Sequence, residues 1–120
     1  MKKRVGKIYK RVIQLLHLSV NENEPIYIGD SNIRHMKTSH AEDYLKYGSY
    51  INVILSSPEY VGINKKDNSI EYVKSFTINN EYVKVAVRVS NNGVYYARSL
   101  YVLNSNRVKN FIKKQTLLQY

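Results

Sequence analysis

One alternating stretch, residues 82–103, constrains the fold of this chain more than any other. Valine stands at every second position from Val83 to Val89, and the run from Val94 to Leu103 is again rich in strand-forming residues. A period of two with β-branched residues indicates a strand that buries one face. Asn92-Gly93 separates the two runs and is typical of a two-residue type I′ loop. The stretch therefore predicts an antiparallel hairpin whose loop sets the pairing.

The register set by that loop determines which residues share each of the two faces of the hairpin. The valine face is expected to be core, with Arg98 as a misfit within it. The other face is polar and has small alanines that leave room above the sheet; an ordinary solvated face is the alternative interpretation. The pairs predicted on it are Lys84 with Tyr101, Ala86 with Ser99, and Arg88 with Ala97.

Length and composition limit the class of protein. A chain of 120 residues predicts a single domain, residues 1–120. There is no cysteine, which excludes thiol chemistry and cysteine-based zinc sites and fits a reducing compartment. No apolar run is long enough to cross a membrane.

The charge of +10 is unevenly distributed. Residues 1–11 hold six Lys or Arg, residues 82–120 hold seven, and all nine Asp and Glu lie between Glu22 and Glu81. Such segregation predicts a polyanionic partner, although it also suits a surface that merely keeps a small protein soluble. The 12 tyrosines add stacking surfaces that suit unpaired bases.

The rest of the chain predicts an α+β domain, in which an antiparallel four-stranded sheet packs against N-terminal and C-terminal helices. Ser39 and Glu42 form a capping-box pattern for the third of the predicted helices, and Gly48 is a plausible stop. If Asn79-Asn80 is a two-residue loop, Glu71 lies opposite Arg88 on the polar face. The expected elements are a helix over 5–18, a short strand over 25–29, helical turns over 30–36, 39–47 and 50–55, strands over 59–63, 69–78, 82–89 and 94–103, and a last helix capped by Asn104 or Ser105.

The histidines are the main candidates for chemistry. His17 follows two leucines and is expected to be structural, whereas His35 and His40 lie in a polar segment. A metal site built on this pair would need a further ligand such as Asp30, Glu42 or Asp43, and we expect none. Histidine, cation and hydroxyl in a basic protein suit RNA cleavage, in which the 2′-hydroxyl of the substrate attacks the adjacent phosphate.

Several motifs together resemble a known family, the phage-type nucleases of the Barnase–EndoU–colicin–RelE (BECR) superfamily. The resemblance covers about residues 5–115. It implies an α+β nuclease fold and a metal-independent endoribonuclease of phage, prophage or toxin origin, without a cofactor. The motifs that carry it are Gly29–His40, Ile54–Val61, Ser69–Lys74, Val85–Arg88 and Tyr96–Tyr101.

The resemblance also implies a site. Its motifs match His35, His40, Arg88, Ser99 and Tyr101, which are the catalytic candidates. Beside them, we expect Lys84, Arg98, Glu71 and Lys74 to be substrate-binding residues. His40 is expected as general base or acid, His35 as its partner, and Glu71 as a group that orients Arg88. The implied partners are RNA, with tRNA as one target by analogy to colicin-type relatives, and a cognate immunity, antitoxin or host protein. A location in the cytoplasm of the bacterial host follows from the same resemblance.

Two other functions compete with the nuclease. A non-catalytic module of the same fold would bind RNA, or a host or defence protein, through its basic surface, as a phage counter-defence protein would. A membrane-surface protein is disfavoured because the N-terminal helix has no Trp or Phe anchor.

Overall fold

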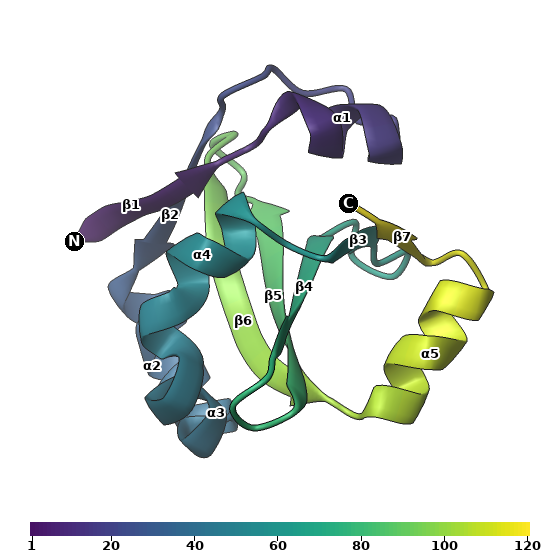
Figure 1. Ribbon diagram of the computed structural model, residues 1–120. Helices are drawn as coiled ribbons and strands as arrows, with labels where there is room; N and C mark the ends of the chain where they lie inside the picture. Colours follow the sequence, from purple (N-terminus) through teal and green to yellow (C-terminus); the bar gives the residue numbers. More distant parts are fainter.

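The computed structural model describes all residues from 1 to 120 and has a mixed α+β architecture around one sheet (Figure 1). No helix is long and apolar enough to cross a membrane. Its elements are β1 (Lys2–Lys7), α1 (Lys10–Leu16), β2 (Pro25–Gly29), α2 (Asp30–Ser39), α3 (Ala41–Tyr47), η1 (Gly48–Tyr50), α4 (Ile51–Ser56), β3 (Tyr60–Ile63), β4 (Ile70–Phe76), β5 (Glu81–Val89), β6 (Tyr95–Leu103), α5 (Ser105–Lys113) and β7 (Leu117–Gln119).

The sheet has seven strands in the order β1-β2-β6-β5-β4-β3-β7, so the expected four-stranded sheet is wrong, although the α+β class is confirmed. The four predicted strands are β3 to β6. β2 joins them parallel to β6, while every other neighbouring pair is antiparallel. β7 pairs with β3 at Gly62, which lies so close to the Thr116 carbonyl that a Cβ would not fit. The three added strands, β1, β2 and β7, join the sheet through pairing between segments that are distant in sequence.

The predicted helix over 5–18 is wrong in its first half. Lys2–Lys7 forms the edge strand β1, and the helix is limited to Lys10–Leu16. Ile8 and Val12 are fully buried, as the apolar spacing requires. The same spacing also fits a strand followed by a short helix. The strand forms because the backbone of β1 pairs with that of β2, which the spacing of apolar residues does not reveal.

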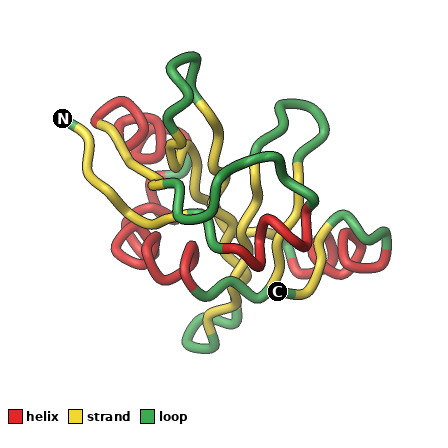
Figure 2. Tube along the Cα trace, turned by 90° about the horizontal axis from the view of Figure 1, so that it is seen from above, coloured by secondary structure: helices red, strands yellow, loops and turns green.

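The valine face is core, as predicted, except at Val89, which is 46% exposed near the end of the hairpin. Val83, Val85 and Val87 are fully buried beneath α1 and α4, in a cluster that also contains Tyr72 and Leu100. α5 covers one end of the opposite face with a smaller cluster of Val73, Leu103, Val108 and Leu117. The helices of residues 30–56 and α5 lie at opposite ends of the molecule (Figure 2). The rest of the second face, between them, stays open.

The central hairpin has a three-residue loop and a β-bulge, not the predicted two-residue loop. The Ser90 amide donates to the Val94 carbonyl at 2.8 Å, and the Gly93 amide to the Ser90 carbonyl at 3.0 Å. Within this loop only Gly93 has a positive φ, 79°. Arg88 therefore pairs with Tyr96, not Ala97, but the extra residue Arg98 restores the predicted register beyond the bulge.

The bulge corrects the expectation that Arg98 lies in the core. Arg98 and Ser99 together oppose Ala86, so Ala97 takes the buried position on the valine face and Arg98 is exposed on the polar face. A buried, unpaired guanidinium would be strongly destabilising, and the bulge avoids it. The predicted pairs of Lys84 with Tyr101 and of Ala86 with Ser99 are confirmed.

The strands β4 and β5 are joined by four turn residues, 77–80, rather than two. Glu71 consequently lies opposite Ala86, and the predicted pairing of Glu71 with Arg88 is wrong. A shift of two residues keeps every side chain on its predicted face, because side chains alternate with a period of two. Glu71 therefore remains on the polar face.

α2 and α3 meet at His40, and this differs from the predicted cap. Ser39 ends α2, and His40 is the flanking residue of both helices, with φ −142° and ψ 61°. α3 does end at Tyr47 with Gly48 as its C-cap, as predicted, but Gly48 is right-handed and begins η1 instead of adopting the left-handed conformation of a terminating glycine. The Asp43 carboxylate of α3 accepts the Val102 amide of β6 at 3.0 Å. This hydrogen bond ties α3 to the part of β6 that extends past its pairing with β2.

Candidate functional site

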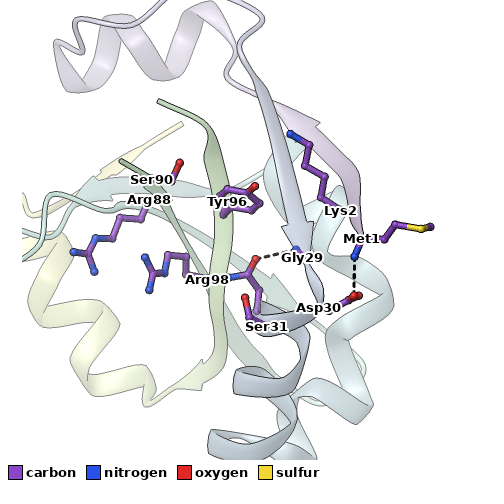
Figure 3. Close-up of a pocket in the computed structure, with 10 residues that line it drawn as sticks. Met1, Lys2, Gly29, Asp30, Ser31, Arg88, Ser90, Tyr96 and Arg98 are labelled. Carbon is purple, nitrogen blue, oxygen red and sulfur yellow. Dashed lines mark hydrogen bonds and ion pairs between the residues drawn. The ribbon is translucent and has the colours of Figure 1, made fainter. Parts of the chain in front are cut away.

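The open part of the polar face contains a groove where β5 and β6 meet the beginning of α2 (Figure 3). Two adjoining hollows, of about 480 and 360 Å³, form it and share Ser31, Asn32, Arg88 and Arg98. The residues that complete the hollows are Met1, Lys2, Gly29, Asp30, Ser90 and Tyr96 in the first, and His35, Asp67, Ser69, Ala86 and Ser99 in the second.

Two arginines stand at the centre of the groove. Arg88 belongs to β5 and Arg98 is the bulge residue of β6; both side chains extend in the same direction in Figure 3. Neither guanidinium takes part in an ion pair or a hydrogen bond within the protein. Two unpaired guanidinium groups side by side repel each other and favour an anion between them, and phosphate matches their planar donor geometry.

The beginning of α2 forms the opposite wall. The Asn32 side-chain oxygen accepts the Gly29 amide at 2.8 Å, which fixes the turn from β2 into the helix. This turn places Ser31 and Asn32 beside the two arginines. Asp30 is held away from them by an ion pair of 2.7 Å with the Met1 amino group. The hydrogen bond to that amino group lowers the pKa of the Asp30 carboxyl.

His35 and Ser99 line the second hollow. His35 is exposed, one turn further along α2, and its Nδ1 lies 3.4 Å from the Ser39 hydroxyl. The Nε2 atom is left without a partner in the protein and can exchange a proton with a bound molecule. Ser99 follows the bulge residue, so the bulge directs Arg98 and the Ser99 hydroxyl to the same hollow.

Asp67 is the carboxylate of the second hollow. Its Oδ1 accepts the Ser69 amide at 3.0 Å and the Ser69 hydroxyl at 2.8 Å. These hydrogen bonds lower the pKa of the Asp67 carboxyl, and the nearby cations Arg88 and Lys84 add to the effect. Asp67 thus holds the loop before β4 in place at the floor of the groove.

A second group of predicted residues forms a neighbouring cluster on the same face. The Lys84 ammonium contacts the Glu71 carboxylate at 2.6 Å and lies 4.7 Å from the centre of the Tyr101 ring. The ring of His40 stacks on the ring of Tyr101, with the ring centres 4.8 Å apart. Burial opposes the charge of Lys84, but hydrogen bonds to Glu71 and Tyr101 raise its pKa overall. Glu71 therefore orients Lys84, not Arg88.

The structure thus divides the predicted site residues into three places. His35, Arg88, Arg98 and Ser99 line the groove. The cluster beside it contains His40, Tyr101, Lys84 and Glu71. Lys74 lies apart from both, on the valine face, where its ammonium donates to the Ser57 carbonyl at 2.8 Å.

Sequence reasoning did not single out several residues of the groove, among them Ser31, Asn32, Asp67 and Tyr96. Ser31 and Asn32 could have been found, because they follow directly on a strand that ends at Gly29 and precede the candidate His35. Tyr96 was missed because the predicted two-residue loop would place it on the valine face, opposite to the face it occupies. No group of three or more His, Asp or Glu side chains is placed to hold a metal ion.

Comparison with known proteins gives one match. A family model described as phage-Barnase-EndoU-ColicinE5/D-RelE like nuclease 3 matches residues 3–110. No curated protein and no solved structure matches the chain significantly. The match covers nearly the whole chain, including the strands β2 to β6, all of β1 but Lys2, and all residues of the groove except Met1 and Lys2. The chain therefore belongs to the family of phage-Barnase-EndoU-ColicinE5/D-RelE like nucleases, as its sequence motifs suggested.

Proposed function

We propose that this nuclease is an endoribonuclease that cleaves RNA by attack of the 2′-hydroxyl on the adjacent phosphate. One observation carries the proposal: a histidine, a serine and two arginines free of carboxylate partners line the same groove. The reaction needs a proton acceptor, a proton donor and cations around the phosphate. It needs no metal-bound water, because the nucleophile belongs to the substrate.

Each group of the groove has a role in this reaction. Arg88 and Arg98 bind the non-bridging oxygens of the phosphate and stabilise the charge that develops on the pentacoordinate state. His35 accepts the 2′-hydroxyl proton or donates a proton to the leaving 5′-oxygen. Ser99 donates a hydrogen bond to the phosphate or the ribose. The O2′–P bond forms as the P–O5′ bond breaks, which leaves a 2′,3′-cyclic phosphate and a 5′-hydroxyl.

The reaction requires a second proton-transfer group, and His40 is the candidate. Its ring stacks on Tyr101, which the buried Lys84 contacts from β5. Stacking fixes the plane of the imidazole, and the exposed edge of His40 stays accessible. We therefore assign His35 to the groove proper and His40 to its side, and retain Tyr101 as the residue that orients His40.

The substrate we favour is single-stranded RNA, including the loops of tRNA. Positive charge with aromatic side chains suits unpaired bases. Because a free cytoplasmic RNase would damage its own cell, a protein inhibitor is the further partner that we propose.

The test is incubation of the purified protein with total RNA and with tRNA in EDTA. We expect fragments that end in a 2′,3′-cyclic phosphate, and we expect His35→Ala to abolish them. His17→Asn is the matched control, because His17 is exposed at the end of α1, outside the groove, with a φ of 54° that asparagine tolerates.

Two results would contradict the proposal. Cleavage of DNA at a rate equal to that of RNA would exclude a 2′-hydroxyl nucleophile. Well-folded protein that leaves RNA intact but binds it in a salt-sensitive way would instead indicate the non-catalytic binding module.

A further inference from the structure

The polar face of the sheet continues past the groove, onto β2 and β1. The register places Tyr96 opposite Arg88 on one side and beside Tyr27 of β2 on the other. Tyr27 in turn lies opposite Arg4 of β1. Side chains at paired positions point to the same face of a sheet, so these four residues form a row across four strands.

The two tyrosines of the row lie next to each other, and a further cation, Lys2, lies over one of their rings. The rings of Tyr27 and Tyr96 are 6.4 Å apart and tilted by 50°. The Lys2 ammonium lies 4.4 Å from the centre of the Tyr27 ring. Figure 3 shows Lys2 and Tyr96 on the same side of the sheet, above the two arginines. Both tyrosines are only half buried and belong to neither hydrophobic cluster, so the core does not explain them.

We propose that the RNA strand leaves the groove across β6, β2 and β1, with its bases stacked on Tyr96 and Tyr27 and its phosphates bound by Lys2 and Arg4. Tyr96 lines the groove itself, next to Arg88 and Arg98, so the nucleoside beside the bound phosphate meets its ring first. Alternation of rings and cations is the arrangement that single-stranded nucleic acids require, because each nucleotide presents one base and one phosphate. The nuclease therefore reads an unpaired strand several nucleotides long.

This inference rests on the proposed function in taking RNA as the ligand, but binding can be measured without cleavage. The probes are oligonucleotides of two and six residues with 2′-O-methyl groups, which cannot be cleaved by 2′-hydroxyl attack. Tyr96→Leu removes the ring on which one base stacks, so we expect it to weaken binding of the hexamer about tenfold, which is typical for the loss of one stacked base. Tyr27→Leu should weaken binding of the hexamer but not of the dimer, because Tyr27 lies one strand further from the groove.

Two variants separate stacking from a structural role. Tyr96→Phe keeps the ring and should bind as the unmutated protein does. Tyr9→Leu is the matched control, because Tyr9 also has a lysine over its ring, Lys7 at 5.2 Å, but lies outside the groove and the row. A 2-aminopurine base placed next to the bound phosphate should lose fluorescence on binding. We expect that loss in Tyr96→Phe and not in Tyr96→Leu.

The cations have a readout of their own. Replacing Lys2 or Arg4 with Gln should reduce the slope of log affinity against log salt by about 0.7 each, the value for one phosphate contact of a single strand. Unchanged hexamer binding in Tyr96→Leu and Tyr27→Leu, or no binding of any oligonucleotide, overturns the inference. RNA cleavage is measured in the same variants and tests the proposed function separately. If the protein cleaves RNA equally well without the two tyrosines, only the inference about the extended strand is refuted.

Discussion

At the scale of single residues, the ion pair between Glu71 and Lys84 is the main polar feature inside the protein. The side chains are only 15% and 10% exposed, respectively, and the contact is 2.6 Å long. Burial penalises both charges, and each is tolerated because the other is present. The pair supports the ring of Tyr101 and, through it, His40. Its integrity should therefore matter for stability and for the position of the histidine.

We predict that Lys84→Met lowers the free energy of unfolding by about 3 kcal/mol, because it leaves the Glu71 carboxylate buried without a partner. Combining it with Glu71→Gln should recover part of the loss, since the buried charge is then removed. Lys46→Met is the control, because Lys46 is half exposed and its contact with Glu81 is 3.7 Å long. Urea denaturation measures all four proteins. A single Lys84→Met variant as stable as the unmutated protein would show that the pair contributes nothing.

Tyr72 presents the opposite case, a hydroxyl that is buried without any partner. Burial raises the pKa of this phenol strongly, so it stays neutral. We predict that Tyr72→Phe leaves the protein equally stable or more stable by up to about 1 kcal/mol, because an unsatisfied polar group is removed. Thermal unfolding provides the measurement.

The comparison for Tyr72 is Tyr47, whose hydroxyl donates to Glu81 at 2.7 Å and accepts from Asn79 at 3.0 Å. Tyr47→Phe should destabilise the protein by about 1 kcal/mol, the usual net value of a hydrogen bond. Equal losses in the two variants would mean that the Tyr72 hydroxyl does have a partner.

At the scale of elements, the hairpin of β5 and β6 builds the site. Its three-residue loop moves the pairing by one position, and the bulge at Arg98 moves it back. Between the two, Arg88 and Tyr96 face the groove, and the bulge adds Arg98 to them. Loop and bulge therefore have to occur together for Ala97 and Leu100 to lie on the same buried face as Val83, Val85 and Val87.

We predict that Gly93→Ala costs about 1 kcal/mol of stability, because its φ of 79° is strained for any residue with a Cβ. No other atom lies within 4 Å of the added Cβ, so the cost is conformational and not steric. Asn91→Ala, at a neighbouring position without positive φ, is the control. Equal stability of both variants would contradict the loop conformation described.

The same hairpin shows what the sequence could predict. Period-two valines identified both strands and the buried face, because burial of one face is a local property of the pattern. The loop type and the bulge could not be read from Asn92-Gly93, since both a two-residue and a three-residue loop accept glycine at that point. β1 and β7 were missed for a different reason: each pairs with a strand that is distant in sequence, and β7 itself has only three residues.

The site was predicted in part. Spacing in one strand identified Lys84, Ala86 and Arg88 as one polar face, and the resemblance added His35 and His40. The separation of the two histidines into a groove and a neighbouring cluster depends on the break between α2 and α3 at His40. The capping-box pattern predicted Ser39 as the N-cap, whereas Ser39 ends α2 and His40 is the N-cap of α3. Such a pattern indicates where a helix starts, but it does not show that another helix continues up to that point.

At the scale of the whole molecule, the sheet order brings the two basic ends of the chain together. β2 joins β1 to β6, so the cations of the first strand adjoin those of the hairpin on one face. The segregation of charge along the sequence thus becomes a groove with a basic and aromatic extension. The family match and this groove support one account, in which Arg88 and Arg98 hold the phosphate that is cleaved.

The most direct test of that account uses a DNA oligonucleotide with a single ribonucleotide, for which kcat/KM is measured with each arginine variant. We predict cleavage only after the ribonucleotide, and a loss of about a hundredfold in Arg88→Ala and in Arg98→Ala, since each removes a donor to the charged transition state. Arg34→Ala, on the exposed side of α2, should stay close to the unmutated protein. Unchanged kcat/KM in both groove variants, or cleavage of the same oligonucleotide without its ribonucleotide, would contradict the account.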